Sequence, residues 1–349
     1  MSVLTVAVTA ASLLVAPTVT LELPAPTGPY EVGVVNRHLV DRSRADPWVP
    51  ERRRELMVSL WYPALRGTGP AARYVTPEES ALILEAQNVT GVPSEILSTT
   101  VTHSRAGAVP LPHQNRRPLV VLSPGFTLPR SSLTGLAEDL ASRGYVVAGI
   151  DHTYESAAVT FPDGRIAECL MCGRADGPKV TASRVRDVQF VLDSLRGGYD
   201  ARRVAMVGHS LGGSAASAAM VADPRIDVGV NLDGTVQVDL PARGLDRPFV
   251  LIGNAKHGVP GDDKTWTDAW SRLTGWKRWL SVTGTTHLSF TDFAPLGDQA
   301  GLPIQPLGGT RSMQITRAYV AATLDKHLRA APGPLPRYPE AVFQNPVNR

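Results

Sequence analysis

Residues 208–212 read Gly-His-Ser-Leu-Gly and directly follow the apolar run at 204–207. A serine with glycine two residues away on either side is typical of a nucleophile elbow, a sharp strand-to-helix turn that exposes the hydroxyl. Glycine is favoured at those two positions because a Cβ would collide with neighbouring backbone. We therefore predict that Ser210 is a catalytic nucleophile; the alternative is a glycine-rich turn that merely opens a helix.

A serine hydroxyl needs a base within hydrogen-bond reach, and the base needs a group that orients it. His287 is the first histidine after the last predicted strand, and we predict that it is the base. His152 closely follows a strand and could line the cleft, His257 lies in a loop, and His209 adjoins Ser210 and should point away from it. The other four histidines lie before the core elements or in the final helix: His38, His103, His113 and His327.

The orienting acid has three candidates between the serine and the histidine. Asp233 directly follows the run at 229–232, so its carboxylate should emerge at the carboxyl edge of a strand. Asp262 and Asp263 lie in the loop after the next strand, about ten residues beyond its end. We favour Asp233, whose alternative role would be to cap the turn at Gly234.

An oxyanion intermediate needs two backbone N–H donors aimed at the developing charge. One should come from Leu211, the residue after the nucleophile. The other should come from Phe126, in the Ser-Pro-Gly-Phe-Thr turn at 123–127 that follows an apolar run. A tight turn without a catalytic role would also explain the proline and glycine.

Short apolar runs alternate with helix-like segments, which predicts an α/β fold with a mostly parallel central sheet flanked by helices. The predicted strands are 55–62, 119–123, 145–150, 203–208, 228–232, 249–252 and 279–282, and the predicted helices are 77–87, 133–143, 183–196, a small-residue helix at 213–219, and 313–329.

The domain organisation follows from this pattern. Residues 28–330 are predicted to form one domain, because 349 residues with 43% hydrophobic content suffice for one large α/β unit. Residues 66–117 fit the alternation of strands and helices poorly and are interpreted as a partial cap over the cleft. The alternative is a long connection that has only a structural role. The proline-rich tail at 331–349 should wrap the surface without forming an element.

Composition excludes several function classes. The formal net charge is +3, from 35 basic and 32 acidic residues spread along the chain, so the sequence shows no concentration of basic residues that would bind nucleic acid. Cys169 and Cys172 lack the second pair of ligands that a zinc site needs, so a local disulfide or two free thiols is favoured over metal or redox chemistry. No apolar run is long enough for a membrane span.

The N-terminal segment at 1–27 contains an apolar, alanine-rich stretch at 5–17 that is similar to the core of a signal peptide, although no Lys or Arg precedes it. We expect a secreted protein, with a cytoplasmic one as the alternative.

Several motifs resemble the plasma and type II branch of the platelet-activating factor acetylhydrolase family, within the α/β-hydrolase superfamily. They lie at 28–33, 46–48, 60–63, 123–126, 140–147, 208–213, 231–234 and 287–293. The resemblance implies an α/β-hydrolase fold, hydrolysis of short or oxidised acyl groups from phospholipids, and no metal or other cofactor. It also implies Ser210 as nucleophile, His287 as base, Asp233 as orienter, and the N–H groups of Phe126 and Leu211 as oxyanion hole.

The turn at 123–126 begins Ser-Pro-Gly-Phe where the animal enzymes begin with histidine and glycine, and in this it is similar to bacterial cutinase-like polyester hydrolases. The predicted function is a serine esterase acting on small-molecule esters with short acyl chains, including the sn-2 acyl group of phospholipids. The alternatives are a cutinase-like polyester hydrolase or lipase, and a non-catalytic binding protein of the same fold.

Overall fold

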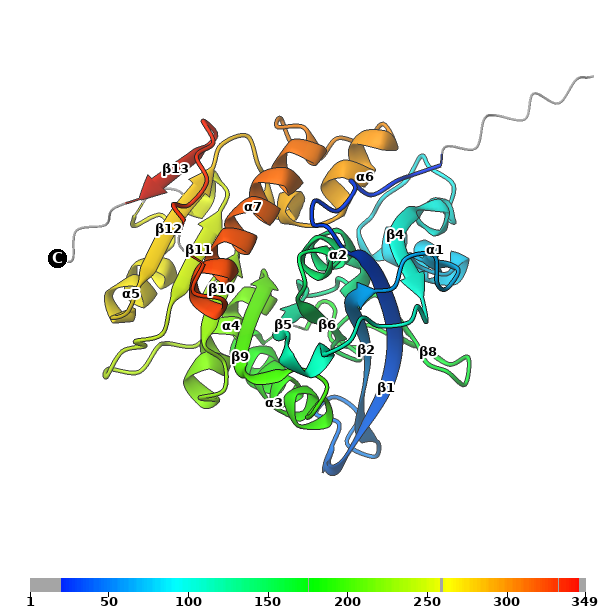
Figure 1. The fold of residues 1–349 in the computed structure, drawn as a ribbon, viewed down its shortest axis with the longest axis horizontal. Helices are drawn as coiled ribbons and strands as arrows, with labels where there is room; N and C mark the ends of the chain where they lie inside the picture. The colour runs from blue at the N-terminus through cyan, green and yellow to red at the C-terminus, as the bar shows by residue number, and fades with distance from the viewer. Residues whose placement is uncertain (1–19, 175, 258–259, 332, 345–349) are drawn as a thin grey trace, which may run out of the picture.

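A computed structural model describes residues 20–174, 176–257, 260–331 and 333–344. Within these residues an eleven-stranded sheet runs in the order β13-β12-β11-β10-β9-β5-β6-β2-β1-β4-β3, with helices on both faces (Figure 1). Its centre is parallel and consists of β12 (Lys277–Val282), β11 (Phe249–Gly253), β10 (Val228–Leu232), β9 (Asp200–His209), β5 (Pro118–Ser123) and β6 (Val146–Asp151). The predicted mostly parallel sheet flanked by helices is confirmed.

The central strands are apolar throughout because helices bury both of their faces. In β5, Leu119 and Val121 belong to the core on the side of α3 (Gly177–Ser194), α4 (Leu211–Ala222) and α5 (Lys264–Arg272). Val120 and Leu122 point the other way, into the core formed with α2 (Thr134–Ser142) and α7 (Gly309–Leu328). This two-sided burial fixes the strand ends, and with them the turns that carry the candidate site.

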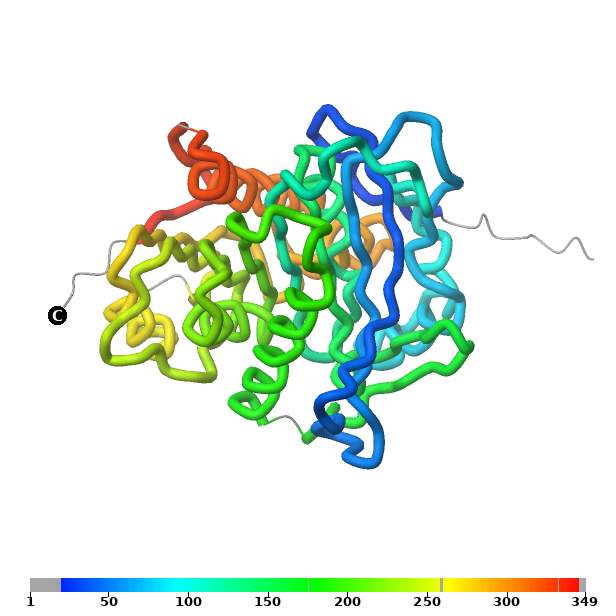
Figure 2. The backbone as a smooth tube through the Cα atoms, turned by 60° about the horizontal axis from the view of Figure 1, so that its bottom comes forward, coloured from blue at the N-terminus to red at the C-terminus, as the bar shows by residue number. Residues whose placement is uncertain are grey.

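The strand β1 (Glu31–Ala45) pairs antiparallel with β2 (Arg53–Ala64), and we call this pair the β1–β2 ribbon; Figure 2 shows the two strands side by side. β2 in turn pairs antiparallel with β6. The sequence did not predict β1, because much of its side-chain surface is exposed and its polar residues hide the alternation. This pair extends the sheet away from the parallel centre.

The segment at 66–117, interpreted above as a partial cap, contributes largely to the sheet edge. Its strands β3 (Ala71–Arg73) and β4 (Val101–Ala106) pair with each other, and β4 adds to β1. Between them lie α1 (Pro77–Ala86) and the short helix η1 (Ile96–Thr99), and η2 (Gln114–Arg116) follows. Beside the predicted oxyanion turn lies the end of α1, where Gln87 donates a 3.0 Å hydrogen bond to Thr127.

The tail forms a strand, so the expectation that it contains no element is wrong. Residues of β13 (Ala341–Gln344) pair antiparallel with β12. The reason is local: 341–344 is a proline-free stretch, so its N–H groups can join the ladder despite the prolines on either side.

The remaining elements lie in the connections. They are the hairpin β7 (Ala158–Thr160) and β8 (Ile166–Glu168), the helix α6 (Phe293–Gln299), and the 3-10 turns η3 (Arg130–Leu133), η4 (Ala255–His257) and η5 (His287–Phe290). Cys169 and Cys172, just after β8, form a disulfide.

The apolar stretch at 5–17 lies outside the described residues. Every helix within them is too short or too polar to cross a lipid bilayer.

Candidate active site

Ser210 lies in the turn between β9 and α4, at the carboxyl edge of the sheet. Its φ of 55° and ψ of −123° are unusual for a residue with a side chain. A Cβ at Gly208 would overlap the backbone of Gly212, and one at Gly212 would overlap the carbonyl of Ser123. The tight approach of these backbones holds the strained turn that presents the serine hydroxyl.

His287, at the start of η5, lies between Ser210 and Asp233. Its Nε2 is 2.9 Å from Ser210 Oγ, and its Nδ1 is 2.7 Å from Asp233 Oδ2. A carboxylate only accepts hydrogen bonds, so Nδ1 carries the proton and Nε2 is free to accept from the serine hydroxyl. The His287 side chain is 49% exposed while that of Asp233 is fully buried, so a substrate can reach the histidine but not the acid.

Asp233 follows β10 directly, in a left-handed conformation with φ of 58°. Asn231 stabilises this turn with two hydrogen bonds to the backbone of Gly234. The carboxylate also accepts hydrogen bonds from the backbone and side-chain nitrogens of Asn254, at 2.7 and 2.9 Å. Burial disfavours its charged form, but the hydrogen bonds from His257 and His287 outweigh burial and lower the pKa of Asp233 to about 2.

The two other candidate acids do not reach His287. Asp263 lies 3.0 Å from Nε2 of His257 and caps α5 by accepting from the N–H of Thr265. Asp262 is exposed. The structure therefore brings Ser210, His287 and Asp233 together, which is the arrangement that the sequence favoured.

The predicted oxyanion donors lie in the turns that follow two neighbouring strands, β9 and β5. Leu211 is the first residue of α4, where the helix dipole favours negative charge, and Phe126 follows the Pro-Gly turn after β5. Within the described part of the chain, neither of these backbone N–H groups donates to a protein acceptor. Both are therefore available to a ligand.

A buried polar cluster lies behind this turn. Ser123 Oγ is 2.9 Å from His152 Nε2, and His152 Nδ1 is 2.8 Å from Asp187 Oδ2. Arg184 donates a 2.5 Å hydrogen bond to the carbonyl of Pro124. His152 is 1% exposed, so it supports the turn instead of lining the cleft as its sequence position allowed, and burial lowers its pKa to about 3.

His209 also contributes in a way that sequence reasoning missed. Its side chain is buried, and its Nε2 donates a 2.8 Å hydrogen bond to the carbonyl of His287. Burial lowers the pKa of His209 to about 3, so the ring is neutral. The residue beside the candidate nucleophile thus anchors the backbone that carries the candidate base.

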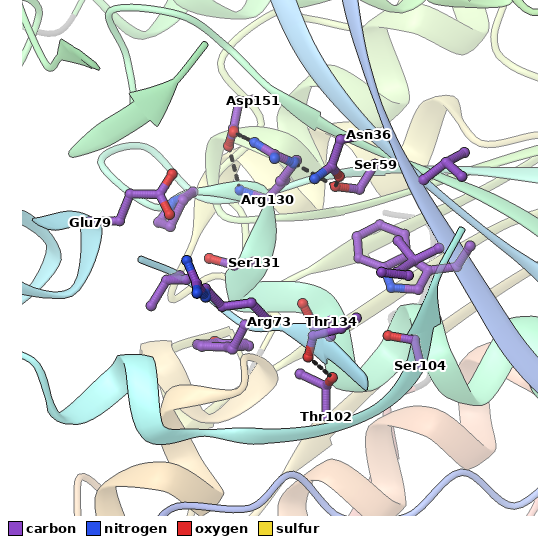
Figure 3. Close-up of a pocket in the computed structure, with 18 of the residues that line it drawn as sticks. Asn36, Ser59, Arg73, Glu79, Thr102, Ser104, Arg130, Ser131, Thr134 and Asp151 are labelled. Atoms are coloured by element: carbon purple, nitrogen blue, oxygen red, sulfur yellow. Dashed lines mark hydrogen bonds and ion pairs between the residues drawn. The ribbon is translucent and has the colours of Figure 1, made fainter. Parts of the chain in front are cut away.

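A cavity of about 520 Å³ lies between the β1–β2 ribbon and α1 (Figure 3). Arg130 lies in the upper part of the view, hydrogen-bonded to Asp151 and Ser59, and Ser131 and Arg73 lie below it. Ser210, Asp233 and His287 are not among its lining residues.

A smaller, apolar cavity of about 90 Å³ is lined by Leu288, which follows the candidate base, and by Phe293 and Leu84. The described residues contain no cluster of three or more His, Cys, Asp or Glu side chains arranged to hold a metal ion.

Comparisons with known proteins show the family of the chain. The family model described as "Alpha/beta hydrolase family" matches residues 120–345. The chain belongs to the α/β-hydrolase family. A second family model, "Platelet-activating factor acetylhydrolase, isoform II", matches residues 16–168, so the resemblance stated above is confirmed.

Among solved structures, a ferulic acid esterase from Streptomyces cinnamoneus is 43% identical to this α/β-hydrolase, with a TM-score of 0.85 over 93% of this chain and 100% of that chain. A probable 1-alkyl-2-acetylglycerophosphocholine esterase of Arthroderma benhamiae is 27% identical over 92% of this chain and 93% of its own. A cutinase, est1 of Thermobifida alba, is 31% identical over 31% of this chain and 32% of its own.

Proposed function

We propose that this α/β-hydrolase is a serine esterase that uses Ser210, His287 and Asp233 as its catalytic triad. The observation that carries the proposal is the continuous hydrogen-bonded line from the serine hydroxyl through both nitrogens of His287 to the buried Asp233 carboxylate. The names of the relatives, which are esterases and hydrolases of carboxylic esters, support the same reaction class.

The geometry supports a two-step mechanism. His287 Nε2 takes the proton of Ser210 as Oγ attacks the ester carbonyl, and the N–H groups of Phe126 and Leu211 stabilise the oxyanion. His287 then returns the proton to the leaving alcohol, which leaves an acyl-enzyme on Ser210. Water, deprotonated by the same Nε2, attacks the acyl carbon; the acid departs, and the proton returns to Ser210 Oγ. Asp233 stays ionised and stabilises the transient imidazolium.

We propose esters with short acyl chains as the substrates, including phospholipids with a short sn-2 acyl group. The matches to the acetylhydrolase family model and to the Arthroderma esterase support this substrate class. The small apolar cavity beside Leu288 is in keeping with a short apolar acyl group.

A second candidate is hydrolysis of ferulic acid esters. It is favoured by one observation, the 43% identity to the Streptomyces ferulic acid esterase over nearly the whole chain. Both candidates use the same triad and differ only in the acyl group that they accept.

The test is kcat/KM on p-nitrophenyl esters from acetyl to laurate and on methyl ferulate, with Ser210→Ala as the blank. We expect a loss of at least about 10⁴-fold in the variant. A preference for two to four carbons supports the first candidate, and preference for methyl ferulate supports the second. A flat or long-chain profile favours a lipase or cutinase, and activity equal to the blank on every ester favours a non-catalytic binding protein.

We also propose that the protein is exported. The disulfide between Cys169 and Cys172 supports an oxidising compartment, as does the apolar stretch at 5–17. Recovery from the cytoplasm with both thiols free would contradict export.

A further inference from the structure

Asp233 contacts two histidines, one on each carboxylate oxygen. Oδ2 faces His287, and Oδ1 lies 2.8 Å from Nδ1 of His257. The other nitrogen of His257, Nε2, lies 3.0 Å from Oδ2 of Asp263. The order of groups is therefore base, acid, second histidine and second acid.

The geometry fixes the protonation of His257. Both of its ring nitrogens face carboxylate oxygens, which accept hydrogen bonds and cannot donate them when ionised, so both nitrogens carry a proton and the ring is a cation. Burial disfavours this charge, but the hydrogen bonds and charges of the two carboxylates outweigh burial and raise the pKa of His257.

The surroundings hold the ring rigidly. The His257 ring stacks on Trp266 of α5 with centroids 4.4 Å apart, and Trp279 of β12 donates a 2.7 Å hydrogen bond to the His257 carbonyl. Among the described residues, the charged groups that face the ring are Asp233 and Asp263, and the neighbouring Lys256 is exposed.

We propose that His257 and Asp263 form a charge-balancing pair behind Asp233, and that this pair sets how strongly Asp233 supports a proton on His287. The inference rests on the proposed function, because it assigns a role relative to His287 as the base. His257 is a positioning residue in this scheme, since it acts through Asp233 and does not contact the reacting atoms.

The argument is one of charge. A lone cation at His257 would partly neutralise Asp233 and make His287 a weaker base. Asp263 cancels that effect, because Asp233, His257 and Asp263 together carry one net negative charge, the same as an unpartnered aspartate. The cation orients Asp233 by a hydrogen bond, while the second carboxylate preserves the field at His287.

This scheme predicts opposite shifts for two substitutions. Asp263→Ser removes the carboxylate without placing an amide donor against Nε2 of His257, so the cation is left uncompensated. The imidazolium form of His287 is then less stable, and the acidic limb of the kcat/KM profile moves to lower pH. His257→Asn removes the cation but places an amide nitrogen near the position of Nδ1. The uncompensated charges of Asp233 and Asp263 then stabilise the protonated form of His287, and the acidic limb moves to higher pH. Each shift should be about 0.5 to 1 pH unit, and the double variant should return close to the wild-type limb.

Asp263→Ser should fold, because serine is an equally good helix cap and its hydroxyl can still accept from the N–H of Thr265. The matched control is Asp262→Ser, which removes an exposed carboxylate one residue away and should leave the limb in place. If His257→Asn unfolds, His257→Gln provides a second neutral variant, and melting temperatures identify any unfolded variant.

The experiment is the pH dependence of kcat/KM for p-nitrophenyl acetate from pH 4.5 to 9 at constant ionic strength, for all five proteins and for Ser210→Ala. Opposite shifts that cancel in the double variant support the proposal. A fall in kcat/KM without a shift of the limb would overturn it, as would shifts of both variants in the same direction or an Asp263→Ser profile that matches wild type. If Ser210→Ala retains wild-type activity, the proposed function itself fails, which is a distinguishable result.

Discussion

The replacement Asp233→Asn tests the triad through the hydrogen-bond directions around the acid. The backbone N–H of Asn254 can only donate, and it points at Oδ1 together with the protonated Nδ1 of His257. An asparagine at 233 must therefore place its carbonyl oxygen at the Oδ1 position. Its amide group then occupies the Oδ2 position, where it faces Nδ1 of His287.

An amide nitrogen donates, so Nδ1 of His287 must then accept. The proton of the neutral ring moves to Nε2, which faces Ser210 and can no longer take the serine proton. The wrong tautomer of the base is therefore imposed by the fixed donors on the far side of Asp233. Loss of the correct tautomer together with the negative charge should lower kcat about 10⁴-fold, equivalent to about 5 kcal/mol of transition-state stabilisation.

The assay is kcat for p-nitrophenyl acetate at pH 7.5, together with the rate at which a fluorophosphonate labels Ser210. Both rates should fall together, because both need the same proton transfer. Asp262→Asn serves as the matched carboxylate control and should lose less than about twofold. A value of kcat for Asp233→Asn above a tenth of wild type, with the fold intact, would refute the assignment of Asp233 as the orienting acid.

Two further predictions concern the frame of the site. Gly212→Ala should lower kcat at least about 10²-fold and lower the melting temperature, because the new Cβ displaces the carbonyl of Ser123 and the turn that carries Phe126. The control is Gly308→Ala, whose new Cβ would meet only one atom, 3.9 Å away. Equal activity of the two variants would contradict the argument. His209→Gln should destabilise the protein at pH 7, but by about 2 kcal/mol less at pH 5. The sign follows from the pKa of His209, which is about 3 in the folded protein and an ordinary 6.5 in the unfolded chain. As the pH falls from 7 to 5, the unfolded wild-type chain binds a proton that the folded protein does not bind. The free energy of unfolding of the wild type therefore decreases, whereas that of His209→Gln does not change through this residue. Urea unfolding at both pH values measures the difference, and a penalty that does not change with pH would rule out a neutral, buried His209.

The central strands could be predicted from the sequence because two-sided burial makes them continuous apolar runs with sharp ends. The run at 228–232 coincides with β10, and 119–123 differs from β5 by one residue. The long β1 could not be found in this way, since its partners are supplied by β2 and β4 and its own sequence is largely polar. The helix α5 was missed for a related reason: its apolar face consists of little more than Trp266, Ala269 and Trp270.

The candidate triad was accessible from sequence because each of its members follows a strand end, where the chain order restricts the choices. Motif and order are enough to select Ser210 and His287, and the position of Asp233 directly after a strand favours it over a loop residue. The contacts that hold these side chains were not accessible. The hydrogen bond from His209 to the carbonyl of His287 joins residues 78 positions apart, and no local pattern indicates it.

The same reasoning explains why Asp263 was a reasonable sequence candidate and yet is not the residue that contacts the base. An aspartate before a helix has a local use, and here Asp263 caps α5 through Thr265. That cap fixes its position on the far side of His257, whose ring fills the space between it and Asp233. Asp233 has no such local commitment, because its N–H completes the sheet by donating to Ile252 and its carboxylate is left to accept from two histidines and Asn254. The residue that local structure leaves unused is therefore the one that can serve the base.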